Sequence, residues 1–74
     1  MAYYRNDTIL EKFGLRLREI RKLKNTSQEQ LAEKSGFMLS QVGRIERGEI
    51  NTSLSHLSKL SEALDVSLKE LMDL

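Results

Sequence analysis

The sequence predicts an all-α fold of five helices around one core. The 74 residues include no proline and only four glycines, so the chain has few positions at which a helix must end. Apolar residues recur at intervals of three and four, which is the spacing of one helix face. Two segments carry Ser followed three residues later by Gln or Glu, the capping box that begins a helix. These are Ser27 with Gln30 and Ser67 with Glu70.

The first helix is expected from residue 9 or 10 to residue 24. It follows an N-terminal arm of residues 1–8, which shows no clear periodicity, so the folded domain is expected to comprise residues 9–74. Asn25 is expected to end this helix, because asparagine tolerates the left-handed conformation better than most residues. The core side of the helix is predicted to be Ile9, Phe13, Leu17 and Ile20.

Two short helices joined by a tight turn are expected between Ser27 and Glu49. Gly36 should end the first of them, because glycine adopts the left-handed conformation without a steric penalty. The second should run from about Leu39 to Arg47 and end at Gly48. A helix-turn-helix of this length is the shape that places its second helix in the major groove of DNA.

The two sides of this second short helix differ in chemistry. Its aliphatic residues, Val42 and Ile45, project to one side. A charged helix face is most often only solvated, but the opposite side here carries no acid. It includes a glycine, which costs about 1 kcal/mol of helix stability relative to alanine unless a partner must approach closely. The residues on this side, which favour a binding surface, are Ser40, Gly43, Arg44 and Arg47.

Two further helices are expected after a connecting loop at residues 49–52. Ser53 should cap a helix from about residue 54 to residue 64, with a core side of Leu54, Leu57, Leu60 and Leu64. The last helix concentrates four apolar side chains in seven residues. Either all four complete the monomer core, or some face outward and form a homodimer interface, which we expect because one small core cannot obviously absorb them all. They are Leu68, Leu71, Met72 and Leu74.

Composition narrows the classes of function. The net charge is only +1, but residues 1–48 hold ten Lys or Arg against six Asp or Glu, and residues 49–74 hold two against five. A basic N-terminal part and an acidic C-terminal part of the chain suit a protein that faces phosphates on one side. With no cysteine and one histidine, His56, neither a disulfide nor a metal site is expected. We expect no cofactor, no enzymatic activity, no membrane span and a cytoplasmic location.

The phrases SQEQLA, RIERGE and LSEALDVSLKEL, in this order and spacing, resemble the Xre/Cro family of phage-repressor-like helix-turn-helix regulators. The resemblance extends from about Phe13 to Leu74. It implies a lambda-repressor-like fold of five helices, sequence-specific binding of double-stranded DNA at a near-palindromic operator, and a role as a repressor or autoregulator. Members commonly pair through the C-terminal end, so the resemblance also implies a homodimer.

The resemblance and the helix projection together predict residue roles. The residues expected to read bases are Met38, Leu39, Ser40, Gly43 and Arg44, because arginine commonly contacts guanine and apolar groups contact the thymine methyl. Those expected to hold the DNA backbone are Gln28, at a helix N-terminus, and Arg47. The family pattern also pairs Arg21 with Glu46, which would lock the first helix to the third.

Departures from the family leave the operator sequence open. Met38 stands where a serine or threonine cap is common, Leu39 where a glutamine often reads bases, and Gly43 where a larger polar residue often lies. A stand-alone controller, a phage repressor and an antitoxin are not separable from these residues. A different class also remains open, an antitoxin-like or anti-repressor protein-interaction module on the same scaffold.

Overall fold

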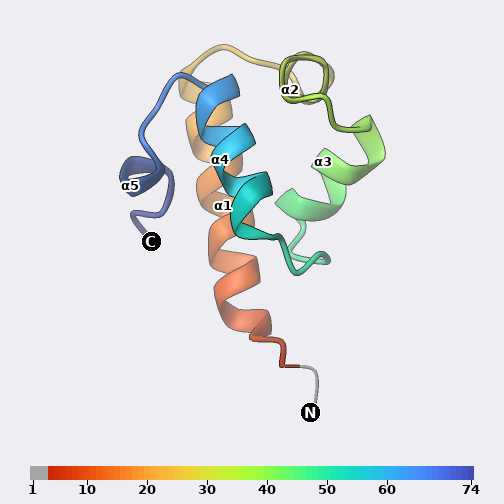
Figure 1. Cartoon of the computed structure of the whole chain (residues 1–74), viewed down its shortest axis with the longest axis vertical. Helices are drawn as coiled ribbons and strands as arrows, with labels where there is room; N and C mark the ends of the chain where they lie inside the picture. The colour runs from red at the N-terminus through yellow and green to blue at the C-terminus, as the bar shows by residue number, and fades with distance from the viewer. Residues whose placement is uncertain (1–3) are drawn as a thin grey trace.

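The computed structural model describes residues 4–74, which form five helices and no strand. The helices are α1 (Asp7–Leu23), α2 (Gln28–Ser35), α3 (Leu39–Glu46), α4 (Leu54–Ala63) and α5 (Leu68–Leu71). The predicted all-α fold of five helices is confirmed. In Figure 1, α2 and α3 lie together on one side of the long helix α1, and α5 lies on the other side. Residues 1–3 of the expected arm lie outside the described part of the chain.

Helix α1 begins earlier than the sequence predicts. The side chain of Asn6 caps it, since its Oδ1 accepts a hydrogen bond from the Ile9 N–H at 3.2 Å, so the helix already includes Asp7 and Thr8. Its core side also differs from the prediction. Leu10 is buried, whereas Ile9 is 43% exposed, because adjacent residues project about 100° apart around a helix.

The helix ends follow the chemistry of single residues. Gly36 ends α2 with φ of 78°, and Asn25 follows α1 with φ of 51°, both as predicted. Asp65 takes the same left-handed conformation after α4, with φ of 56°. The capping box of α2 is complete, because Ser27 Oγ accepts from the Gln30 N–H at 3.0 Å and the Gln30 side chain accepts from the Ser27 N–H at 2.8 Å.

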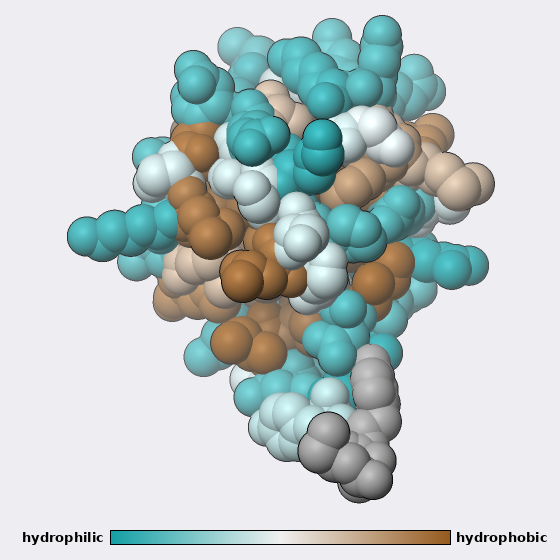
Figure 2. All heavy atoms as spheres, viewed as in Figure 1, coloured by the Kyte–Doolittle hydropathy of each residue, from teal (hydrophilic) through white to brown (hydrophobic). Residues whose placement is uncertain are grey.

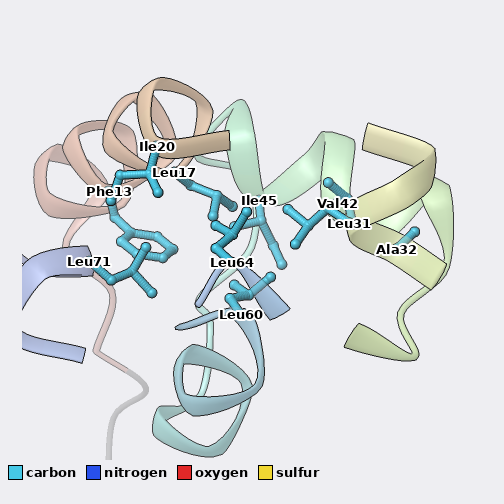
Figure 3. Packing of buried hydrophobic residues seen from close by; sticks show 10 residues of the cluster. All are labelled: Phe13, Leu17, Ile20, Leu31, Ala32, Val42, Ile45, Leu60, Leu64 and Leu71. Carbon is cyan, nitrogen blue, oxygen red and sulfur yellow. The ribbon is translucent and has the colours of Figure 1, made fainter. Parts of the chain in front are cut away.

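One hydrophobic core joins all five helices. Its buried side chains point toward one another in Figure 3, and they are Phe13, Leu17, Ile20, Leu31, Ala32, Val42, Ile45, Leu60, Leu64 and Leu71. The prediction that Leu54 belongs to this core is wrong, since its side chain is 71% exposed. Leu54 lies roughly 100° around α4 from the direction midway between Leu60 and Leu64, so it faces outward.

Residues 4–74 contain neither a candidate membrane span nor a candidate metal-binding cluster. No helix there is both long enough and apolar enough to cross a bilayer. The same residues contain no cluster of three or more His, Cys, Asp or Glu side chains that could hold a metal ion.

Candidate nucleic-acid interface

Helix α3 is held on its inner side and open on its outer side. It packs against α1 and α2, and the side chains of Val42 and Ile45 point from it into the core (Figure 3), where they are 0% and 1% exposed. Ser40 and Arg44 are exposed on the opposite side. Burial of the aliphatic side therefore fixes the helix and leaves a polar surface available to a partner.

The start of α3 presents two apolar side chains. Met38 is 71% exposed and Leu39 is 46% exposed. Met38 occupies the N-cap position, and its side chain makes no capping hydrogen bond, because a thioether is only a weak acceptor. The serine or threonine cap common in the family is thus replaced here by an exposed apolar group.

Gly43 is not the open position that the helix projection predicts. It is buried, and an ideal Cβ built on it would lie 3.0 Å from Nη1 of Arg47. The guanidinium of Arg47 therefore extends back along α3 and covers the glycine. A partner can come close to the backbone at Gly43 only if this flexible side chain moves.

Arg47 is paired with an acid that the sequence analysis did not place on this surface. Its Nε donates to Oε2 of Glu49 at 2.6 Å, and the two side chains are 55% and 51% exposed. The hydrogen bond from Arg47 and the positive charges of Arg47 and Arg44 hold the pKa of Glu49 below the ordinary value of a glutamate. The turn at Gly48 brings Glu49 back toward the helix, which a projection of the helix alone does not show.

Arg21 and Glu46 form the ion pair expected between α1 and α3. Nε of Arg21 lies 2.6 Å from Oε2 of Glu46, and Nη2 of Arg21 lies 3.1 Å from Oε1. The Glu46 side chain is 0% exposed. Nη1 of Arg21 also donates to the Thr26 carbonyl at 3.0 Å, so one guanidinium connects α1, the loop before α2, and α3.

Two further donors reach the same carboxylate. Nε of Arg18 lies 3.3 Å from Glu46 Oε1, and Nε2 of Gln28 lies 3.0 Å from it. Gln28, predicted to contact the DNA backbone, therefore directs its amide toward a buried acid in this structure. Its N-terminal place on α2 indicated an anion contact but not which anion, and Arg18 was not predicted at all.

The protonation of Glu46 reflects these partners. Burial raises the pKa of its carboxyl group, whereas hydrogen bonds from Arg21, Gln28 and Arg18 and the charge of Arg21 lower it. The net pKa lies below the ordinary value, so the carboxylate is ionised at neutral pH. No buried side-chain nitrogen or oxygen among the described residues lacks a hydrogen-bond partner.

The predicted dimer residues divide between the core and the surface. Leu71 is 0% exposed and belongs to the monomer core, so its assignment to an interface is wrong. Met72 packs partly against the core, whereas Leu68 is 36% exposed and Leu74 is 46% exposed. A helix of one turn has one inner side, and in α5 Leu71 occupies it.

The C-terminal segment is held against α1. The guanidinium of Arg16 donates to the Glu70 carbonyl from Nη2 at 2.9 Å and from Nε at 3.2 Å. Leu74 lines a shallow hollow together with Ile9, which is 43% exposed. In Figure 2, hydrophobic atoms are grouped on the part of the surface near α4 and α5. Exposed apolar groups of this kind are suited to an interface.

Comparisons with known proteins agree with this geometry. A helix-turn-helix family model matches residues 17–71. Control protein C.BamHI of Bacillus amyloliquefaciens is 44% identical over 62 residues, which are 82% of this chain and 76% of that protein.

Two solved structures resemble the whole arrangement. The restriction-modification controller protein C.AhdI from Aeromonas hydrophila is 52% identical with a TM-score of 0.84, over 86% of this chain and 97% of that one. The structure of SinR, the master regulator for biofilm formation, in complex with DNA is 42% identical with a TM-score of 0.76, over 82% of this chain and 98% of that one.

Proposed function

The chain belongs to the Xre/Cro-like helix-turn-helix family, and from this membership we propose that it binds double-stranded DNA sequence-specifically and regulates transcription, as a repressor or autoregulator. The observation that carries the proposal is the way in which α3 packs in the fold. Its aliphatic side and Glu46 are buried, while Ser40 and Arg44 are exposed on the other side. Such a helix can enter the major groove without loss of its packing.

Arg44 and Ser40 are the proposed base readers. A guanidinium can donate two hydrogen bonds to O6 and N7 of guanine, and a serine hydroxyl can donate or accept. Met38 and Leu39, exposed at the start of α3, are placed to contact thymine methyl groups. Together with Gly43, these residues form the proposed reading surface.

The DNA backbone is the proposed partner of Gln28 and Arg47. The Gln28 amide has two N–H donors, and one of them points to Glu46 at 3.0 Å. The second donor can hold a phosphate at the N-terminus of α2, where the helix dipole also favours an anion. A phosphate contact there would be tied through Glu46 to the recognition helix itself.

The relatives support a regulator of transcription. C.BamHI is named a control protein, C.AhdI a restriction-modification controller, and the SinR structure is a complex with DNA. The same backbone arrangement and the same two-helix motif occur in this chain. We propose that α3 is its recognition helix.

We also propose that the protein acts as a homodimer. Leu74 and Ile9 are exposed side by side, and Leu68 is also exposed, so these side chains are available to contact a second copy. A two-fold dimer places its two recognition helices about 34 Å apart, one turn of DNA, so the operator should be a near-palindrome.

Selection of bound duplexes from random DNA at a stated salt concentration tests the proposal. A near-palindromic site that the wild type binds more tightly than a scrambled duplex, and that Arg44→Ala binds more weakly than the wild type, would support it. Failure to enrich any sequence, with the protein folded, would overturn it in favour of the protein-interaction module.

A further inference from the structure

The exposed carboxylate of Glu49 lies just beyond the C-terminal end of α3. Glu49 Oε2 accepts a hydrogen bond from Arg47 Nε at 2.6 Å, and both side chains are about half exposed. The same carboxylate also interacts electrostatically with Arg44, the proposed base reader. An acid therefore lies beside the two exposed arginines of α3.

The backbone places Glu49 there. Its N–H donates to the Arg44 carbonyl at 2.9 Å, and the Gly48 N–H donates to the Ile45 carbonyl at 3.0 Å. Gly48 has φ of 74°, the left-handed conformation that returns the chain toward the end of the helix.

Helix α1 supports this turn from beneath. An ideal Cβ on Gly48 would lie 2.9 Å from Cα of Glu11, so the turn rests directly on the α1 backbone. Nη2 of Arg5 donates to the Gly48 carbonyl at 3.2 Å. The local turn therefore sets the position of Glu49 beside Arg47, and packing on α1 supports that turn.

We propose that Glu49 is an internal competitor for DNA phosphate, which occupies Arg47 in the free protein and must be displaced when DNA binds. This inference rests on the proposed function. Carboxylate and phosphate oxygens satisfy a guanidinium in the same way, so the two anions compete for one donor group. Breaking the Arg47–Glu49 pair therefore subtracts from the free energy that Arg47 gains at the phosphate.

The movement of Arg47 from Glu49 to a phosphate would also uncover Gly43. The Arg47 guanidinium that bonds Glu49 is the group that covers Gly43, with Nη1 3.0 Å from the ideal Cβ position. When Arg47 moves to a phosphate, it leaves both Glu49 and Gly43. One side-chain movement therefore forms a backbone contact and exposes the closest point of the helix to the groove.

Glu49→Gln is the direct test. The variant keeps the shape of the side chain and removes its charge. We expect affinity for both a selected duplex and a scrambled duplex to rise by about two- to five-fold per bound protomer, the range expected when an exposed ion pair no longer competes. The slope of log K against log salt should steepen by up to about 0.9 per protomer.

Two further variants show whether Glu49 acts through Arg47. Glu62→Gln removes the same charge from an exposed position on α4 and should change affinity much less. In an Arg47→Ala background, Glu49→Gln should lose most of its gain, because the competed group is absent. A gain of equal size in that background would overturn the inference, since Glu49 would then act by direct repulsion.

Other outcomes separate this inference from the proposed function. No gain from Glu49→Gln in a wild type that binds DNA overturns the inference alone. Weaker binding of the selected duplex, with scrambled binding unchanged, also overturns it and shows that Glu49 reads a base. If the wild type binds no duplex, the proposed function fails. In that case, an NMR titration of Glu49 without DNA still tests the pair, because its pKa should rise when Arg47 is replaced by Ala.

Discussion

The backbone of Glu46 lies directly against Gly14. The Glu46 carbonyl oxygen occupies space that a Cβ at position 14 would need, and the Ile45 carbonyl oxygen would be only 2.7 Å from that Cβ. Helices α1 and α3 therefore meet backbone to backbone at this point. Glu46 joins the two helices twice, through its carbonyl group at Gly14 and through its carboxylate at Arg21.

We predict opposite effects for the same substitution at Gly14 and Gly43. Gly14→Ala should destabilise the fold by about 1–3 kcal/mol, because backbone atoms cannot yield to the added methyl without moving α3. Gly43→Ala meets only the end of the Arg47 side chain, so helix propensity should stabilise the fold by up to about 1 kcal/mol. Urea unfolding of both variants measures the difference. Equal effects would mean that α1 and α3 can separate at low cost.

Gly43→Ala also tests the reading surface. If the groove must come close to this glycine, the variant should bind a selected duplex more weakly although it is at least as stable as the wild type. Gel shifts at fixed salt measure this. Unchanged affinity would show that position 43 is not part of the reading surface.

We predict that Glu46→Ala costs about 3–5 kcal/mol, because it leaves the partners of a fully buried carboxylate without their acceptor. Marginally stable domains have only about 5–15 kcal/mol in total, so a large unfolded fraction is expected. Circular-dichroism melts measure the loss. Glu62→Gln, at an exposed position, should melt close to the wild type.

Stability should also fall in acid for the same reason. The folded pKa of Glu46 is lowered, so its ionised form stabilises the fold above the ordinary value of 4.5. That contribution is lost progressively as the pH falls from about 4.5 through the lower folded value. Urea unfolding from neutral pH down to that range measures the decline. A free energy of unfolding that stays flat over this range would contradict the assignment.

We predict that Arg44→Ala loses about 1–3 kcal/mol of specific binding and relaxes preference at one base pair. Its side chain is exposed, so the melting temperature should barely change. Binding to selected and scrambled duplexes distinguishes the roles. An equal loss on both would identify Arg44 as a phosphate contact.

Substitutions of the C-terminal leucines should affect folding and dimerisation separately. Leu71→Ala should destabilise the fold by about 2–5 kcal/mol, because Leu71 is fully buried. Leu74→Glu should leave stability nearly unchanged and shift the protein toward a monomer. Sedimentation at micromolar concentration measures the second effect. A wild type that is monomeric throughout, and that pairs only on DNA, would contradict the proposed dimer surface.

Local chemistry was sufficient to determine most of the helix ends, although the Asn6 cap at the start of α1 was missed. Ser27, Gly36, Asn25 and Ser53 act through bonds or φ values within a few residues of themselves, so their roles can be read from the sequence. The Arg21–Glu46 pair was predicted from the family pattern that the sequence matches.

Only the tertiary structure decided which residues are covered and by what. Leu71 and Leu74 are both apolar and lie three residues apart, yet one fills the core and the other faces solvent. Only glycine fits at position 14, because the backbone of Glu46 lies directly against it. Each of these outcomes depends on contacts between segments distant in sequence, and helix periodicity carries no information about them.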